Sequence, residues 1–136
     1  MTEVVIEGGE DLARKLAALS DAVQGQVLEA ALRSGALLVQ NDAKRLVPYR
    51  TGTLRRSIHT ETETQGPGKA EAAVGTDVVY AARVEFGFEG QDKLGRSYHQ
   101  PARPYLRPAL DQNMDAAAQE IAAALREAIE NVGVRT

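Results

Sequence analysis

Residues 38–58, which read LVQNDAKRLVPYRTGTLRRSI, contain the change of local structure on which the rest of the fold depends. Before Leu46 the apolar residues recur at spacings of three and four, the pattern of one face of an amphipathic helix. Pro48 ends that helix and already biases Val47 away from the helical region. Thr51-Gly52 then predicts a turn, because glycine adopts positive φ without steric cost.

Upstream of this junction, residues 10–46 form a helical section. Their apolar residues keep the helical spacing, and Ser20-Asp21 offers an N-cap part-way along. We therefore expect a short helix followed by a long one. If residues 22–46 are continuous, the long helix measures roughly 37 Å at 1.5 Å per residue.

Downstream of the turn, residues 49–76 predict a β-hairpin. Thr53 to Thr64 alternates and is rich in Thr and Ile, which is typical of a strand. Gln65-Gly66-Pro67-Gly68 is a turn signal, and Ala70 to Gly75 is the expected partner strand.

Residues 77–106 are expected to hold a short helix and a loop. Val78 to Glu85 has helical spacing, and Gly87 is placed to end that helix. Phe88 to Gln100 is polar, contains glycine and has no periodicity, so it predicts a loop. We expect Arg103 to Pro108 to be extended, because each proline restricts the residue before it.

The last section, residues 107–133, predicts a helix. An apolar stripe runs from Leu110 to Val132, and Gly133 follows at the position of a C-cap. No internal repeat is visible. The sequence as a whole predicts one α+β domain over residues 1–136, in which long N-terminal and C-terminal helices pack on a small antiparallel β-sheet.

Composition supports a helical core and excludes several kinds of site. The chain of 136 residues is 43% hydrophobic but only 4% aromatic, so its buried area has to come mainly from aliphatic helix faces. It has no cysteine, which excludes disulfides, thiolate nucleophiles and Cys-ligated metals. No apolar run reaches the ~20 residues that span a bilayer. Residues 1–10 are acidic and do not have the pattern of a signal peptide.

The inventory of catalytic side chains is small. His59 and His99 have no ligand-spaced partner of the kind that a zinc site requires. Glu61 and Glu63 share a face of the expected strand, but a solvated strand face explains them better than a hydrolase pair does. Gly66-Pro67-Gly68 is a turn and not a phosphate loop, because proline removes an N–H donor. We therefore expect no catalytic residues, no cofactor and no metal, and hence no enzyme.

Three short motifs stand out in the middle of the chain. Residues 47–58 read VPYRTGTLRRSI, residues 80–87 read YAARVEFG, and residues 102–110 read ARPYLRPAL. In this order, between two long helices, they resemble the tail-completion or head–tail joining proteins of siphophages and prophages. The resemblance covers nearly the whole chain, although residues 89–95 fall in a stretch that this family varies freely.

The resemblance implies a structural virion protein of the phage neck, made in the cytoplasm of the bacterial host. Its partners would be other neck and tail proteins, namely the stopper, the tail terminator and the tail tube. It also implies a homo-oligomeric ring, expected to be a hexamer, that forms on its template from a protein that is monomeric when free. A ring requires two different, complementary patches on each subunit. The motif residues expected at subunit contacts or in structural roles are Pro48, Arg50, Thr51, Gly52, Leu54, Arg55, Arg56, Ser57, Tyr80, Glu85, Phe86, Gly87, Arg103, Pro104, Tyr105, Leu106 and Pro108.

Within the motifs, Tyr80, Phe86 and Tyr105 are expected to anchor the small sheet to the helices, because few other large side chains are present to fill the core. Glu85 and Arg103 are expected to pair and so to hold the second motif against the third.

Two other functions stay open. The basic residues Arg50, Arg55 and Arg56 form either a solvated strand edge or a contact with an acidic neighbouring subunit or with DNA. Together with Lys69 they suggest a small nucleic-acid-binding module, against which the net charge of −3 argues. A hydrolase that uses His59 or His99 with a nearby acid is the other alternative.

Overall fold

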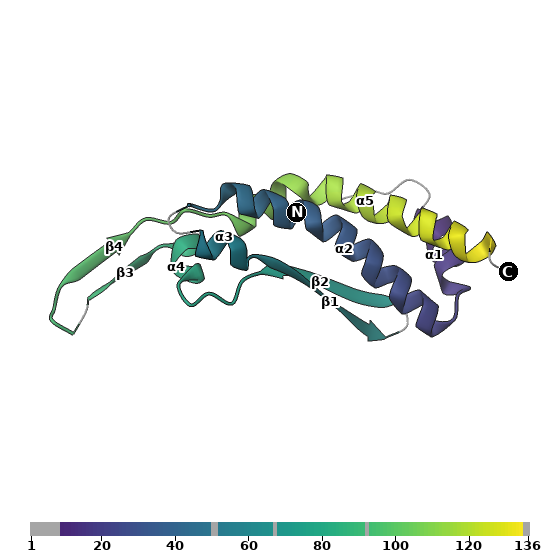
Figure 1. The fold of residues 1–136 in the computed structure, drawn as a ribbon, viewed down its shortest axis with the longest axis horizontal. Helices are drawn as coiled ribbons and strands as arrows, with labels where there is room; N and C mark the ends of the chain where they lie inside the picture. The colour runs from purple at the N-terminus through teal and green to yellow at the C-terminus, as the bar shows by residue number, and fades with distance from the viewer. Residues whose placement is uncertain (1–8, 50–51, 67, 92, 135–136) are drawn as a thin grey trace.

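The computed structural model describes residues 9–49, 52–66, 68–91 and 93–134. The chain forms an elongated molecule in which two long helices lie side by side and two separate β-hairpins accompany them (Figure 1). In chain order the elements are α1 (Gly9–Ala17), α2 (Asp21–Leu46), α3 (Thr53–Ser57), β1 (His59–Gly66), β2 (Lys69–Gly75), α4 (Ala81–Phe86), β3 (Phe88–Gln91), β4 (Ser97–Gln100) and α5 (Leu106–Val134).

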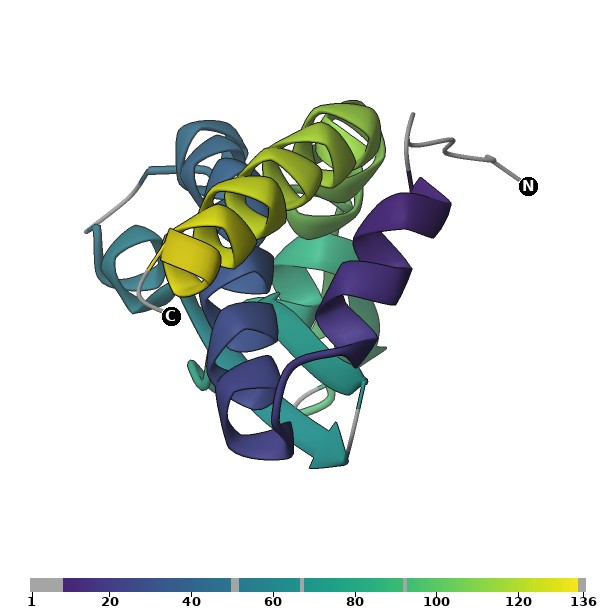
Figure 2. The same ribbon diagram turned by 90° about the vertical axis from the view of Figure 1, so that its right-hand side faces the viewer.

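Helix α2 is the centre of the fold. It lies between α5 on one side and the β1–β2 hairpin on the other, and α1 packs beside α5 (Figure 2). The expected break before α2 is confirmed, because the Ser20 hydroxyl accepts the N–H of Val23 at 3.4 Å. At its other end Val47 is extended, with ψ 136°. The buried residues of α2 fall three or four apart and are Gln24, Val27, Ala31, Gly35, Val39 and Ala43.

The contact between α2 and α5 depends on small residues. A Cβ atom on Gly35 would lie 2.5 Å from Cγ1 of Ile121 and 2.8 Å from the backbone oxygen of Ala117. Ala122 is also fully buried. Asn113 adds a polar link, because its Nδ2 donates to Asp42 Oδ2 at 2.8 Å. The abundance of alanine therefore allows two long helices to approach closely without aromatic side chains.

The β1–β2 hairpin is antiparallel, with His59 opposite Gly75 and Glu63 opposite Glu71. One face packs on α2, where Thr60 Oγ1 donates to Gln40 Oε1 at 2.7 Å. Because side chains alternate along a strand, Glu61 and Glu63 project from the opposite face, and both are exposed. The layers of the molecule are thus α5, α2 and a hairpin whose outer face is uncovered.

The expected strand from Thr53 to Thr64 is wrong in its first part. Residues 53–57 form the one-turn helix α3, whose first bond runs from Arg56 N–H to Gly52 O at 3.0 Å. Leu54 and Ile58 are both buried, whereas Arg56, which would share their face in a strand, is exposed, as expected for a helix. Gly52 has the positive φ of 81° that the Thr-Gly turn predicted.

The expected loop from Phe88 to Gln100 is also wrong, because these residues form a second hairpin. Phe88 pairs with Gln100 and Gln91 with Ser97 in a two-stranded antiparallel sheet. This hairpin, called the arm below, projects from one end of the molecule (Figure 1). Its main contacts are between its own two strands.

The last helix begins earlier than expected, at Leu106, so the extended segment ends at Tyr105. Pro108 lies in the first turn of α5, where its missing N–H costs no intrahelical hydrogen bond.

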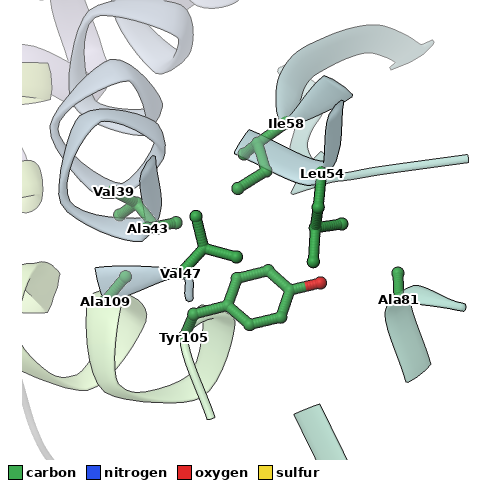
Figure 3. Close-up of a cluster of buried hydrophobic side chains, with 8 residues drawn as sticks. All are labelled: Val39, Ala43, Val47, Leu54, Ile58, Ala81, Tyr105 and Ala109. Carbon is green, nitrogen blue, oxygen red and sulfur yellow. The ribbon is translucent and has the colours of Figure 1, made fainter. Parts of the chain in front are cut away.

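The main core cluster lies where the end of α2 meets α3, α4 and the start of α5. Tyr105 is its largest fully buried side chain and points between Leu54 and Ala81 (Figure 3). The expected anchoring role therefore holds for Tyr105 alone. Tyr80 is 44% exposed and Phe86 is 80% exposed, because the aliphatic residues and Tyr105 already fill the space. The cluster consists of Val39, Ala43, Val47, Leu54, Ile58, Ala81, Tyr105 and Ala109.

The fold class is the α+β arrangement that the sequence predicts, with long helices near both ends and small antiparallel sheets. Within the described residues, no helix combines the length and the hydropathy needed to cross a membrane.

Candidate assembly surface

The second and third motifs interlock through Glu85. This residue is buried, at 6% exposure, and lies near the end of α4. Its carboxylate accepts the backbone N–H groups of Tyr105 at 2.7 Å, Leu106 at 3.0 Å and Arg107 at 3.0 Å. These N–H groups belong to the first turn of α5, which has no intrahelical acceptor for them. Glu85 therefore caps α5 from another element, and its charge complements the positive end of the helix.

The expected Glu85–Arg103 ion pair does not occur between these two described residues. The Arg103 backbone N–H instead donates to Val84 O at 2.8 Å. The Glu85 carboxylate is directed at three backbone donors of α5, so the second motif contacts the third through the main chain and not through a pair of charged side chains.

Gly87 also allows the chain before the third motif to pass close to the end of α4. It ends α4 with φ 81°, and a Cβ atom there would lie 2.9 Å from Gln100 O and 3.0 Å from Ala102 N. Both neighbours are backbone atoms that cannot move aside easily. Glycine is therefore required at position 87 for two reasons, namely its positive φ and the backbone of Gln100 and Ala102 that passes close to it.

The first motif is linked by a hydroxyl pair to the segment just before the second motif. Ser57 Oγ donates to Leu54 O at 2.6 Å at the end of α3 and also lies 2.5 Å from Thr76 Oγ1. Thr76 Oγ1 in turn accepts the N–H of Val78 at 3.1 Å, just before α4. These bonds hold α3 next to the segment that carries Tyr80.

The three motifs together line one open groove, called the motif groove below, with a volume of about 1300 Å³. The first motif contributes Pro48, Tyr49, Gly52 and Leu54, the second contributes Tyr80, Arg83 and Val84, the third contributes Arg103, and the arm with the residue after it contributes Phe88, Gln91, Tyr98, His99, Gln100 and Pro101.

The motif groove is aromatic and basic. Four of the six aromatic residues of the chain line it, and none of its described lining residues is Asp or Glu. Tyr49 is 64% exposed and Tyr98 is 48% exposed. The Arg83 guanidinium lies 4.1 Å from the centre of the Phe88 ring. Exposed tyrosine and arginine in one concave surface are the residues that dominate protein interfaces.

The remaining motif residues lie around the motif groove or beneath it. Arg55 stacks on the ring of Tyr49 at 4.6 Å, and Arg56 is exposed on the same short helix. Phe86 is exposed at the end of α4, Pro104 is exposed before α5, and Leu106 packs against the core cluster. Arg50 and Thr51 lie outside the described residues.

The proposed basic module is not gathered into one patch. Gly68, next to Lys69, donates its N–H to Gln24 Oε1 at the start of α2, whereas Arg55 and Arg56 lie beyond the end of α2. Along α2, Gln24 and Leu46 are separated by roughly 33 Å at 1.5 Å per residue.

Each histidine pairs with an acid at the surface. His59 Nε2 lies 3.1 Å from Glu61 Oε1, and His99 Nδ1 lies 2.8 Å from Glu89 Oε1. Hydrogen bonds to the Ser57 carbonyl and to Glu61 raise the pKa of His59 above 6.5. Within the described residues, no group of three His, Asp or Glu side chains could hold a metal ion.

The sequence alone does not single out Arg83, Phe88 or Tyr98 as site residues. Arg83 lies within the second motif without a distinguishing pattern, and Phe88 and Tyr98 lie in the segment expected to be a loop. The available signal was two short segments, Phe88 to Gln91 and Ser97 to Gln100, separated by a Gly-containing polar turn, which is a weak hairpin pattern.

The sequence profile of one protein family matches residues 10–87, more than half of the chain. That family is HK97-gp10-like, described as "Bacteriophage HK97-gp10, putative tail-component". The chain belongs to this family. The HK97-gp10-like range covers α1 to α4 and the first two motifs, and the arm, the third motif and α5 follow it. No curated protein and no solved structure matched the chain.

Membership in the HK97-gp10-like family indicates a component of a bacteriophage tail and therefore of the virion. It is consistent with the siphophage resemblance of the three motifs.

Proposed function

We propose that this HK97-gp10-like chain is a structural protein of the phage neck that joins head and tail. In this proposal copies of the chain assemble into a ring, which is sixfold by the siphophage resemblance. The ring contacts the stopper, the tail terminator and the tail tube, and no reaction is catalysed. The protein is made in the cytoplasm of the host and acts in the virion.

The observation that carries the proposal is the motif groove. The residues that make the chain resemble head–tail joining proteins come from three separate segments, and all three segments contribute to this one open surface. Val79, next to the lining residue Tyr80 in the chain, is 97% exposed, and Phe86 at the end of α4 is 80% exposed. An isolated subunit leaves this apolar area in water, and burial against a neighbour removes it.

A closed ring also requires a second surface that differs from the first. The outer face of the β1–β2 hairpin carries Glu61, Glu63 and Glu71 against Lys69 and His59, so it is net acidic, in contrast to the basic groove. The molecule therefore has the charge asymmetry that head-to-tail contacts between identical subunits need.

Electron microscopy of particles from the parent phage with this gene deleted tests the neck role. We expect DNA-filled heads that lie apart from tails, because the joining piece is missing. Tail length shows whether the protein also terminates the tail. Tails of normal length indicate a joining role alone, and overlong tails indicate a role in termination. Normal, infectious particles would contradict the proposal.

Nucleic-acid binding is the second candidate, and one observation favours it. Bases stack on aromatic side chains and arginines contact phosphates, so a groove with Tyr49, Phe88, Arg83 and Arg103 fits single-stranded DNA chemically. A salt-dependent gel shift that Tyr49→Ala abolishes would support this candidate. We expect no such shift, given the acidic net charge of −3.

A further inference from the structure

We propose that the motif groove of one copy receives the acidic face of the β1–β2 hairpin of the next copy. The acidic face is named after Glu61, Glu63 and Glu71 on the outer side of the hairpin, all exposed. Lys69 and His59 lie at the two ends of the same face, so its net charge is negative but small. The inference rests on the proposed ring and names the two surfaces that meet in it.

The acidic face carries an unfavourable arrangement when it is free. Glu63 lies directly opposite Glu71 in the antiparallel register. Glu71 accepts a hydrogen bond from the neutral Gln65 side chain, and Glu61, two residues from Glu63 on the same face, pairs with His59. Like charges directly opposite each other destabilise a sheet. Arg33 reaches the edge of this face, but its guanidinium donates to Thr60 O and Thr62 Oγ1. A cationic partner would remove the repulsion.

The motif groove supplies such a partner. Arg83 and Arg103 line it, and within the described residues neither side chain forms an ion pair. The guanidinium of Arg83 is held against Phe88 and keeps its hydrogen-bond donors free for a carboxylate. Positive and negative surfaces of this kind steer association and set its register.

The positions of the two surfaces allow a head-to-tail contact. The arm, whose residues line the groove, projects at one end of the molecule, and the β1–β2 hairpin runs from the middle toward the other end (Figure 1). A contact between such different patches repeats from copy to copy, which is the geometry that builds rings.

The arm gives an independent argument for a partner at the groove. A two-stranded hairpin that packs on little else is only marginally stable by itself. The arm also forms one wall of the motif groove through Phe88 and Tyr98. A hairpin of the next copy in the groove would pack against the arm and hold it in place.

Disulfide trapping tests the contact directly, because the chain has no cysteine of its own. One version carries Glu63→Cys and the other carries Gln91→Cys, each alone. We expect mild oxidation of the mixture to give the mixed dimer in excess over either homodimer, both in concentrated solution and in particles that contain both versions. A chain that carries both substitutions should give a ladder of oligomers.

The control pair is Glu127→Cys with Gln91→Cys, which places the thiol on the exposed face of α5. A Glu63–Gln91 yield no higher than the control in both settings would overturn the inference. Predominance of one homodimer would also overturn it, because it would show a symmetric contact of one patch with itself.

Charge exchange provides a second measurement. In this experiment one chain carries Glu71→Cys and the other carries Gln91→Cys. Adding Glu61→Arg and Glu63→Arg to the first chain should lower the yield of the mixed dimer by at least about tenfold. The reason is that like charges across an interface cost more than the ~1.4 kcal/mol of a factor of ten. Arg83→Glu with Arg103→Glu in the other chain should restore it. Failure of that restoration, in variants that remain folded by circular dichroism, contradicts the pairing.

The two proposals can fail separately. If the deletion gives unjoined heads and tails but no Glu63–Gln91 product forms, the neck role stands and this interface is wrong. If the mixed dimer forms but the deleted phage is normal, the interface is correct and the neck role is wrong.

Discussion

The carboxylate of Glu85 accepts the backbone N–H of Tyr105 at 2.7 Å, which fixes the start of α5 to the end of α4. The same carboxylate accepts two further N–H groups of the first turn. The negative charge of the buried Glu85 carboxylate is thus balanced by the positive end of α5 and not by a side-chain cation. This link places the third motif beside the second and so shapes the motif groove.

Glu85→Ala should lower the free energy of unfolding by about 2–3 kcal/mol, because it leaves buried N–H groups of α5 without an acceptor. Chemical denaturation measures the change. Glu89→Ala is the matched control, since Glu89 is exposed on the arm and should change stability little. Equal losses for both variants would show that the cap contributes nothing specific.

Gly35→Ala should destabilise the protein by about 1–3 kcal/mol, because its Cβ would overlap Ile121 and the backbone of α5. The same substitution at Gly25, in the same helix, is the control. A Cβ there would lie 3.5 Å from Thr64, so Gly25→Ala should be neutral or stabilise by up to about 1 kcal/mol through helix propensity. Thermal unfolding of the two variants separates packing from propensity. Similar changes for both would contradict the close contact between α2 and α5.

Gly87→Ala should cost more than Gly95→Ala, although both glycines have positive φ, 81° and 79°. At Gly95 a Cβ would meet nothing within 4 Å, so only the backbone conformation is strained, by about 1–2 kcal/mol. At Gly87 the Cβ would also press on Gln100 and Ala102. The difference between the two free energies of unfolding measures that contact, and a difference of zero would contradict it.

Tyr105 should make the protein sensitive to alkali. Burial, with a smaller effect from the Glu85 charge, raises the pKa of Tyr105 from 10.0 to about 12. Above pH 10 the unfolded chain releases this proton while the folded chain retains it, so the free energy of unfolding falls until about pH 12. Two pKa units correspond to about 2–3 kcal/mol.

Tyr105→Phe is the test of this pH dependence. Within the described residues the Tyr105 hydroxyl has no hydrogen-bond partner, so the variant should match the wild type at neutral pH within about 1 kcal/mol. Between pH 10 and 12 it should lose less stability than the wild type does. Parallel stability curves for the two proteins over that range would contradict the raised pKa.

Local sequence patterns predicted the elements that depend on neighbours along the chain. The apolar spacing before Leu46, the N-cap at Ser20 and the stop at Pro48 all act within a few residues. The pairing partner from Ala70 to Gly75 follows a turn signal directly. These features could be predicted because their physical causes lie inside the segments themselves.

Two short elements, α3 and the arm, could not be predicted in the same way, whereas the short helix before Gly87 was predicted and is α4. Helix α3 has five residues, too few to show a periodicity, and its threonine and isoleucine neighbours suggested a strand. The arm depends on the register between Phe88 and Gln100, and the side chains of β4 are exposed, so no apolar alternation marks it.

The sequence by itself determined the long helices, the first hairpin and the three motifs, because periodicity, capping and turn residues act locally. Only the tertiary structure decided what the motifs do together. In the structure Glu85, expected to pair with Arg103, caps α5 instead. Tyr105 is buried, whereas Tyr80 and Phe86 are exposed. Lys69 lies apart from Arg55 and Arg56. Each outcome depends on contacts between residues about 20 or more positions apart, whose geometry is set by how α2 and α5 pack and not by any short stretch of chain.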